Sequence, residues 1–403
     1  MYKDLRSLFH DPNQDHEKAF SERSESSQAV HLDMSVSGNQ AFFVIAPEVY
    51  DAALKASRLD KEIAKLTAQL PGKAIISYTE SCLIDEIVIT NEIEGVNSTR
   101  REISEVLDSL AEQDRRKRFH GLVQKYLMLC SGKDIPIRTC DDIRAIYDEL
   151  VLDEIKESDP KNVPDGKIFR DGPVSVLNAA QIPIHQGVEP ESKICSYMES
   201  ALDLLNDETI LPLARISAFH FLFGYVHPFY DGNGRTNRFI SSYAISHEYE
   251  PIVGFRLSYA VKKDISKYYK AFSICEHTLN RGDITPFVIA FSEIVVAAME
   301  SMRDSLKERL ESMRSCSEPK NKLCSEINKS WANDFIEVIV NASLFSANGI
   351  TVSELSTVLS ASRQTIYLHL RELERRDLAI KERIGKKVYW RIDIDKMKDL
   401  YSD

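Results

Sequence analysis

"HPFYDGNGRTNR", residues 227–238, decides how the rest of the chain is interpreted. A proline ends the preceding helix, and two glycine-containing turns lead into the next one. Arg235 and Arg238 then fall in the first turn of that next helix, where the positive end of the helix dipole disfavours a cation. A bound anion would resolve this conflict, so the motif predicts an anion site.

The loop within this motif supplies further anion-binding groups. Gly232 and Gly234 let successive backbone N–H groups point to one place at a helix N-terminus. Arg235 and Arg238 lie three residues apart, so we expect both to project from one side of the first turn. These groups together predict a polyphosphate site. Asp231, an acid among positive groups, is explained if a divalent cation bridges it to the phosphates.

Other kinds of site fit the motif less well. A calcium loop would need an oxygen ligand where Arg235 stands. A zinc site built from His220, His227 and His247 has neither cysteine partners nor HExxH spacing, and we expect His220 to be a core histidine. The phosphate-binding pattern GxxxxGK[ST] is absent from the sequence. His227 itself is expected at a helix C-terminus, where the dipole favours its cationic form.

Composition limits the classes of protein to which the chain can belong. It has 403 residues, 43% of them hydrophobic, and a net charge of -11, which indicates a globular protein of two or three domains. The seven cysteines are scattered and odd in number, which favours reduced thiols and a cytoplasmic location. The stretch "TPFVIAFSEIVVAAM", residues 285–299, is interrupted by Glu293 and too short for a bilayer, so no membrane role is implied.

The periodicity is mostly helical. Residues 1–45 are polar and are expected to form a loosely structured arm, and amphipathic helices follow from Pro47 onward. The stretch "DGKIFRDGPVSVLNAAQIPIHQG", residues 165–187, has the glycines, prolines and short β-type runs of a small hairpin. We therefore predict a mostly α core with one β-hairpin.

The C-terminal segment differs in pattern and in charge. Residues 351–392 indicate a helix, a turn, a second helix and two strands joined at Gly385, the order of a winged helix-turn-helix module. Basic residues outnumber acids between Ala361 and Arg391, which favours DNA as a partner. The side chains expected to contact DNA are Arg363, Gln364, Thr365 and Tyr367 in the second helix and Lys386 and Lys387 in the wing. Such modules also dimerise or dock proteins, so a homodimer and a protein partner stay open.

The motif at 227–238 resembles the signature of the Fic family (filamentation induced by cAMP), HPFx[DE]GNGRxxR, and matches it at every specified position. The hairpin resembles the family's target-positioning flap, and the resemblance extends over residues 76–300 or so. It implies an α-helical core that transfers AMP from ATP, with Mg²⁺, to a hydroxyl side chain of a target protein. His227 would be the general base and Asp231 the Mg²⁺ ligand. The groups that would hold ATP are Gly232, Asn233, Gly234, Arg235 and Arg238, and Phe229 would anchor the loop.

A second motif, "TNEIEG" at residues 90–95, places acids at a helix C-terminus, where the dipole favours cations. Thr90, Glu94 and Gly95 match the inhibitory pattern of the family, [ST]xxxE[GN]. This resemblance implies that Glu94 pairs with Arg238 and denies it to the γ-phosphate, so that ATP binds unproductively. In some relatives this acid is implicated in removing AMP, so a de-AMPylating hydrolase stays open.

The resulting domain prediction has four parts. They are an N-terminal helical region at 1–135 that carries the autoinhibitory helix at about 76–95, a Fic catalytic core at 136–311, a linker at 312–326 and a winged-helix domain at 327–403. A nucleotide-sensing regulator that binds DNA stays open as an alternative from another class. The intact His227 speaks against that alternative, because sensing a nucleotide needs no base.

Overall fold

The computed structural model describes residues 2–110, 117–130, 133–177, 183–384 and 387–401. The chain is mostly helical and divides into two compact units. The first comprises Met1–Asp60 and Asp85–Glu300, and the second Lys61–Ile84 and Ser301–Asp403. Three helices contribute residues to both units: α3 (Pro47–Thr67), α4 (Gly72–Ile93) and α14 (Thr285–Ser315).

The N-terminal residues are structured, which corrects the prediction of a loose arm. They form α1 (Leu5–Phe9), α2 (His16–Ser24) and the antiparallel strands β1 (Ala29–Val36) and β2 (Asn39–Val44). Alternate residues of β1, Leu32, Met34 and Val36, are buried. This alternation spans only a few residues between polar stretches, so the sequence pattern alone does not indicate a strand here.

The predicted helices and the predicted hairpin are present around the motif. The elements before it are α5 (Arg100–Ser109), α6 (His120–Cys130), α7 (Cys140–Tyr147), α8 (Asp153–Ser158), β3 (Ser175–Leu177), β4 (Pro183–Gln186) and α9 (Glu191–Leu205). Strands β3 and β4 pair antiparallel and form the expected hairpin, which we call the flap, residues 172–188. At the end of α4, Gly95 has a φ of +71°, the left-handed conformation that closes helices and favours glycine.

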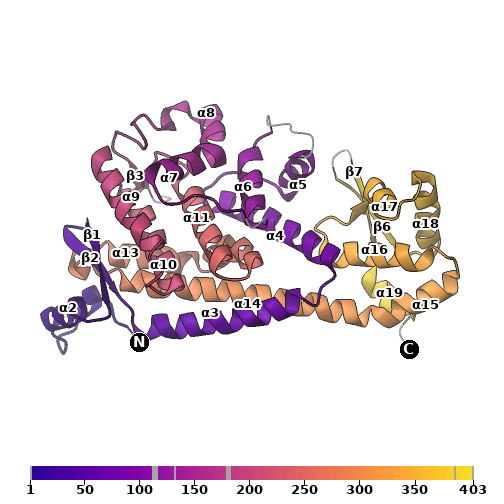
Figure 1. The fold of residues 1–403 in the computed structure, drawn as a ribbon, viewed down its shortest axis with the longest axis horizontal. Coiled ribbons are helices and arrows are strands. Elements are labelled where there is room, and N and C mark those ends of the chain that lie inside the picture. Colours follow the sequence, from indigo (N-terminus) through magenta and orange to yellow (C-terminus); the bar gives the residue numbers. More distant parts are fainter. Residues whose placement is uncertain (1, 111–116, 131–132, 178–182, 385–386, 402–403) are drawn as a thin grey trace. The chain divides into compact units, whose positions relative to one another are not determined.

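The centre of the first unit is a group of buried helices. They are α10 (Pro212–Val226), α11 (Asn233–Glu248), α12 (Leu257–Lys263), α13 (Ile265–Cys275) and the first part of α14. Helix α10 packs against both α9 and α11 (Figure 1) and is apolar on nearly all sides, as expected for a helix enclosed by others. A window within the helical stretch Thr285–Ile327 has a mean hydropathy of 1.4, enough for a membrane span by composition, and 67% of that window is buried inside the protein.

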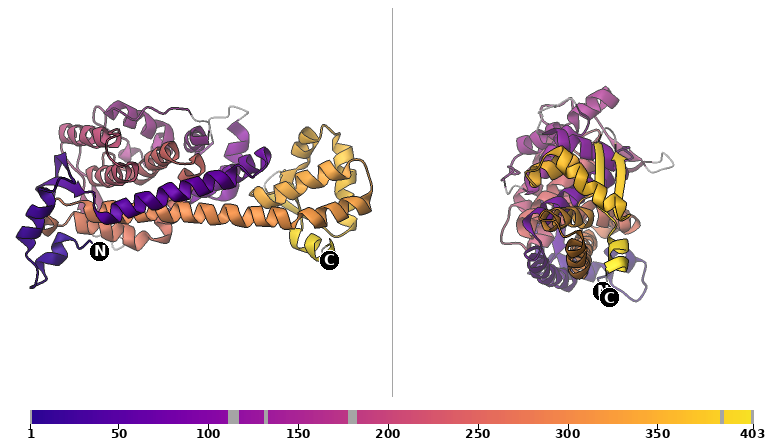
Figure 2. Two further views of the ribbon diagram at one scale, coloured as in Figure 1. Left: turned by 60° about the horizontal axis from the view of Figure 1, so that its bottom comes forward. Right: turned by 90° about the vertical axis from the view of Figure 1, so that its right-hand side faces the viewer.

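The second unit has its own core and a three-stranded sheet of order β5-β7-β6, with β6 and β7 running side by side (Figure 2). Its elements are α15 (Ser317–Ile327), α16 (Ala332–Phe345), β5 (Ile350–Thr351), α17 (Val352–Val358), α18 (Arg363–Arg375), β6 (Ala379–Ile384), β7 (Lys387–Ile392) and α19 (Ile394–Tyr401). The order α17, α18, β6, β7 is the predicted order, and the assignment as a winged helix stays a prediction.

The segment 312–326, expected to be a linker, is helical. It forms the end of α14 and most of α15, and Leu323 and Cys324 are buried in the core of the second unit. Its serines and lysines, together with a single proline, predict a linker. The serines and lysines are exposed or half-buried, whereas Pro319 is buried with the apolar residues of α15.

Candidate active site

The loop between α10 and α11 has two left-handed residues that set its course. His227 follows the last turn of α10 with φ 52° and ψ 63°, and Gly232 precedes α11 with φ 78°. A Cβ on Gly232 would stand 2.8 Å from Val151 Cγ2, so both conformation and space favour glycine there. The side chain of Asn233 accepts from the Phe229 N–H at 3.0 Å and donates to the Phe229 carbonyl at 2.7 Å. Asn233 therefore closes the loop with its side chain.

Phe229 anchors this loop, as predicted. Its side chain is fully buried, stacks on Tyr147 with ring centroids 3.7 Å apart and meets Phe169 edge-on. Burial of an aromatic ring of this size stabilises the packed state by about 2 kcal/mol or more. The motif at 227–238 is thereby held against α7.

His227 is half-buried and neutral near pH 7, the form that suits a general base, whereas the helix dipole taken alone favours the cation. Burial, followed by the charge of His185 and a smaller effect of Arg170, lowers the pKa of His227 to about 4. These effects exceed the helix-dipole effect that predicted a cation, because burial penalises the charged form. Nδ1 lies 3.4 Å from the Gly224 carbonyl oxygen, which can only accept, so Nδ1 carries the proton and Nε2 is the basic nitrogen.

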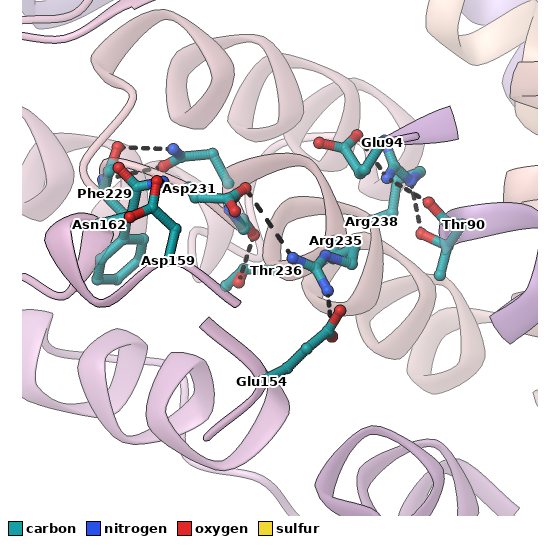
Figure 3. A network of polar contacts seen from close by, with 12 residues as sticks. Thr90, Glu94, Glu154, Asp159, Asn162, Phe229, Asp231, Arg235, Thr236 and Arg238 are labelled. Atoms are coloured by element: carbon teal, nitrogen blue, oxygen red, sulfur yellow. Dashed lines mark hydrogen bonds and ion pairs between the residues drawn. The ribbon is translucent and has the colours of Figure 1, made fainter. Parts of the chain in front are cut away.

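The Glu94–Arg238 pair that the sequence predicts is present (Figure 3). Arg238, which is 2% exposed, donates from Nη2 to Glu94 Oε1 at 2.7 Å. Thr90, one helical turn before Glu94, accepts from Arg238 through its hydroxyl at 2.8 Å and its carbonyl at 3.1 Å. The end of α4 therefore satisfies the guanidinium that the first turn of α11 presents.

Glu94 also lies against the backbone of that first turn. A Cβ added to Gly234 would overlap the Glu94 carboxylate, so the absence of a side chain at 234 is what lets the acid approach. The carboxylate thus occupies the position where a helix N-terminus attracts an anion. This carboxylate is the internal anion that accounts for Arg238 in this turn.

The two arginines of the motif have different partners, which corrects the expectation that they converge. Arg235, also buried, donates to Glu154 on α8 at 2.6 Å and lies 3.9 Å from Asp231 (Figure 3). Glu154 accepts a second bond from Arg118 at 3.0 Å. Long side chains three residues apart on a helix can diverge, and here each follows the nearest carboxylate.

Asp231 is suited to a divalent cation. Its side chain is 44% exposed, and one carboxylate oxygen accepts from the Gly232 N–H. The other oxygen has no partner among the residues that the structure describes. Within those same residues no group of three or more His, Cys, Asp or Glu is arranged to hold a metal. One free carboxylate oxygen fits Mg²⁺, which is commonly held by one or two carboxylates with phosphates and water.

A cavity of about 540 Å³ lies beside these groups. The signature contributes His227, Asn233, Gly234 and Arg238 to its wall, and Glu94 of α4 lines it as well. Asn237 of α11 also lines it, and its other walls come from the flap, α10 and the α13 region, through Val176, His185, Gly224, Tyr268, Tyr269, Lys270, Phe272, Ser273 and Glu276. Arg235 and Asp231 lie outside this lining. A base, an anion-binding helix start and aromatic side chains therefore share one cavity.

Comparison with known proteins agrees with this geometry. Residues 138–245 match the model of the Fic/DOC family. Residues 138–245 are therefore called the Fic domain, after the family that they resemble. A protein adenylyltransferase, fic-1, of Caenorhabditis elegans is 28% identical over 166 residues, 39% of this chain and 30% of that protein. Protein adenylyltransferase Fic of Drosophila melanogaster is 32% identical over 91 residues, 22% of this chain and 16% of that protein.

The chain thus spans less than a third of the length of these curated relatives. Among solved structures, a Fic family protein from Desulfovibrio desulfuricans G20 matches with a TM-score of 0.50 at 18% identity, and the match covers 87% of this chain and 97% of that one. At this identity the likeness supports the fold alone.

Several residues that line the cavity are not indicated by any sequence motif. His185 on the flap donates from Nε2 to the Tyr225 carbonyl at 2.8 Å, and its Nδ1 lies 3.2 Å from Glu276. Tyr269 comes from α13, more than thirty residues after the motif. Neither belongs to a local pattern, so only their position in the fold identifies them. His220 is the core residue expected, fully buried and bonded to Ser241 and Tyr268.

The residues predicted to contact DNA lie in the second unit, apart from the Fic domain in sequence. Arg363, Gln364 and Tyr367 on α18 and Lys387 at the start of β7 are exposed, whereas Thr365 is half-buried and bonded to the helix-capping Ser362. Lys386 lies outside the described residues. The buried residues of α18, which include Ile366, Leu370 and Leu373, face the core of the unit.

Proposed function

We propose that this protein is a protein adenylyltransferase, which transfers AMP from ATP to a Ser, Thr or Tyr hydroxyl of a target protein. The observation that carries the proposal is that Arg238, the glycine-rich first turn of α11 and His227 line one cavity, with His227 neutral and its Nε2 basic. The names of the relatives, at 28% and 32% identity, support the same activity.

The proposed reaction uses His227 as general base. Nε2 takes the proton of the target hydroxyl as its oxygen attacks the α-phosphorus, and the bond from the α-phosphorus to the bridging oxygen breaks so that pyrophosphate leaves. The backbone N–H groups at the start of α11 and the Arg238 guanidinium stabilise charge on the phosphates. Asn233 contributes through the loop that its side chain closes. Arg235 reaches a phosphate only if it leaves Glu154.

We further propose that Asp231 holds Mg²⁺. When bound, the ion would neutralise phosphate charge and orient the leaving group. Asp231 suits this role because one of its oxygens is free of partners among the described residues and the side chain is half-exposed. Its place beside the first turn of α11 keeps the carboxylate near the phosphate site while Arg235, 3.9 Å away, limits its repulsion of the phosphates.

Autoinhibition by Glu94 is part of the proposal. Its carboxylate bonds to Arg238 and lies against Gly234, so a γ-phosphate and Glu94 compete for one guanidinium and one helix start. A hydrogen bond to a charged group contributes roughly 1.5–3 kcal/mol. ATP would then bind with its phosphates displaced from the productive position, and transfer would be slow until the end of α4 moves.

The test is transfer of label from α-³²P-ATP with Mg²⁺ to the protein itself. We expect strong labelling of Glu94→Gly and background labelling of both the wild type and Glu94→Gly/His227→Ala. Glu92→Gly is the matched control, because Glu92 is two residues away at the same helix end but pairs with Lys262 instead. If Glu94→Gly stays unlabelled while it binds ATP, the assignment as an adenylyltransferase fails.

The reverse reaction is a second candidate, because Glu94 and His227 line the same cavity and Glu94 could orient a water toward an AMP-modified hydroxyl. Wild-type protein would then release AMP from Glu94→Gly protein that has been labelled in advance, and Glu94→Gln would not. If the labelled Glu94→Gly protein kept its label in the presence of wild-type protein, the de-AMPylating activity would be ruled out and AMP transfer would be the proposed activity that remains.

For the second unit we propose binding to DNA by α18 and the wing, within a cytoplasmic protein whose six described cysteines are all free thiols. Support comes from the exposure of Arg363, Gln364, Tyr367 and Lys387. Arg363→Ala should weaken binding to duplex DNA, and affinity should fall steeply with salt. Lys320→Ala is a control from the same unit, since Lys320 pairs with Glu337 away from α18. Equal binding by both variants would instead favour a protein partner or a homodimer for this unit.

A further inference from the structure

Arg170, just before the flap, is fully buried and bonds the active-site backbone from several sides. Its Nε donates to the His227 carbonyl at 2.9 Å, and its Nη2 to the Val226 carbonyl at 3.4 Å. Its own backbone N–H donates to the Pro228 carbonyl at 3.2 Å. Three consecutive carbonyls at the end of α10 therefore accept hydrogen bonds from one residue.

The same guanidinium holds both ends of the flap. Nη1 donates to the Gly172 carbonyl at 2.7 Å, and Nη2 donates to the Val188 carbonyl at 2.8 Å. All four guanidinium hydrogen bonds of Arg170 within the described structure thus go to backbone carbonyls. A buried cation is commonly paired with a carboxylate. Here the carbonyl groups of the last turn of α10, which have no partner within the helix, and the negative end of its dipole stabilise the Arg170 cation in place of a carboxylate.

His227 needs such support. Its left-handed backbone, φ 52°, is disfavoured for a residue with a Cβ, and persists when the surroundings fix it. The Arg170 hydrogen bond to the His227 carbonyl fixes the peptide that follows this residue. The orientation of the imidazole depends on that backbone, since Nδ1 finds its acceptor, Gly224, in the preceding turn.

Gly187, at the end of the flap, gives independent support for a role specific to Arg170. A Cβ built on Gly187 would overlap the Arg170 guanidinium, and it would also stand 3.2 Å from His227 Cβ. The space for the guanidinium therefore exists because residue 187 has no side chain. The arginine and the glycine form one arrangement built from two segments 17 residues apart.

We propose that Arg170 is the positioning residue for His227, fixing the backbone of the general base and the two ends of the flap relative to each other. The expected effect of Arg170 on catalysis rests on the proposed function. Its expected effect on the pKa and the tautomer of His227 rests on the contacts alone. The charged groups that act on His227 are His185 on the flap, Glu94 on α4 and Arg170.

The first test is independent of activity. Histidine-labelled full-length protein, with His227 assigned through His227→Ala, is titrated by NMR. Arg170 and His185 both lower the pKa of His227, so Arg170→Gln should raise that pKa and weaken the preference for the Nδ1 proton. Arg170→Lys keeps the charge but cannot reach four carbonyls, so it should alter the tautomer ratio more than the pKa. A His227 titration unchanged in both variants would overturn the proposal.

The second test uses AMP transfer in the Glu94→Gly background. We expect Arg170→Gln and Gly187→Ala each to lower kcat by about 100-fold, the effect of a small displacement of a catalytic group, while the KM for ATP changes far less. The acid limb of the pH profile should move to higher pH in Arg170→Gln only. If kcat and the affinity for ATP fell equally and the acid limb of the pH profile did not move, Arg170 would have only a structural role. If Glu94→Gly itself does not label, the proposed function fails and the NMR titration still decides the role of Arg170.

Discussion

Thr90 accepts hydrogen bonds from the buried Arg238 through two oxygen atoms, so the contact that we propose to be inhibitory involves two residues at the end of α4, Thr90 and Glu94. Thr90→Val keeps the shape and removes the hydroxyl that accepts from Arg238 Nε. Because a bond to a charged group contributes roughly 1.5–3 kcal/mol, we expect labelling by α-³²P-ATP to rise to a level between wild type and Glu94→Gly. Thr90→Ser, which keeps the hydroxyl, should behave as wild type. Activity of Thr90→Val at or below wild type would assign the restraint to Glu94 alone.

His227 sets the expected pH dependence. Its pKa is lowered to about 4, and a general base works in its neutral form, so the base is available above that value and lost as pH falls through it. In Glu94→Gly, kcat should stay level from about pH 8 down to about pH 5 and fall below that range. Initial rates of AMP transfer across that range measure this. A decline centred near the ordinary pKa of histidine would show that His227 is more solvated than its environment indicates.

At the scale of single residues, the motif predicted which residues form the site better than it predicted where their side chains point. The pairing of Glu94 with Arg238, the anchoring by Phe229 and the core position of His220 follow from local pattern and resemblance. The divergence of Arg235 toward Glu154 could not be foreseen, because it depends on a carboxylate 81 positions earlier that only the fold brings near. Arg170 was missed for the same reason, since its acceptors are backbone carbonyls and leave no side-chain signature.

Among the elements, α4 has a second buried attachment besides the Glu94–Arg238 pair. Glu86, fully buried two turns before Ile93, accepts from the Ser258 N–H at 2.9 Å and from the Ser258 hydroxyl, at the start of α12. Burial raises the pKa of Glu86 to about 7, partly offset by the Ser258 bonds. The helix is thus held to α12 through a carboxyl group whose pKa lies near neutral pH.

This attachment should make stability depend on pH. The folded protein binds a proton at Glu86 that the unfolded chain releases near its ordinary pKa, so stability should fall as pH rises from about 4.5 to about 7. The change is on the order of 3 kcal/mol. Glu86→Gln should flatten this part of the pH profile in urea titrations, and Glu92→Gln, at the exposed end of the same helix, should not. Identical slopes in wild type and Glu86→Gln would contradict the assignment.

Elements were predicted well where periodicity was long and poorly where it was short. The helices from α3 to α11, then α13 and α14, and the flap follow from repeated apolar spacing and from glycine and proline positions, whereas α12 was not predicted. Strands β1 and β2 were missed because each offers only a few alternating residues. Helix α15 was mistaken for a linker because its exposed face is rich in serine and lysine, and burial of Leu323 and Cys324 decides its structure.

For the whole molecule, the division into two units gives a direct test of coupling. Both tryptophans, Trp331 and Trp390, belong to the second unit, whereas the proposed ATP site belongs to the first. ATP at 100 times its Kd would stabilise the folded protein by about 2.7 kcal/mol. Because α3, α4 and α14 continue from one unit into the other, we expect ATP to raise the unfolding midpoint seen by tryptophan fluorescence in His227→Ala.

Circular dichroism of the same samples provides the comparison, since it follows the helices of both units. If ATP raised the midpoint measured by circular dichroism but did not change the midpoint measured by tryptophan fluorescence, the two units would unfold independently. Arg363→Ala serves as the control variant, because it lies on an exposed position of α18 and should leave both midpoints unchanged.

The Glu94–Arg238 pair joins two parts of one chain, so in the proposed autoinhibition Glu94 would act as a tethered competitor for the phosphate site. A tethered group acts at an effective concentration fixed by geometry, about millimolar even for a flexible tether, and it cannot be diluted away. The restraint should therefore be equally strong at nanomolar and micromolar protein. We therefore expect release to require a ligand that competes for Arg238 or a movement of the end of α4, whatever the amount of enzyme present.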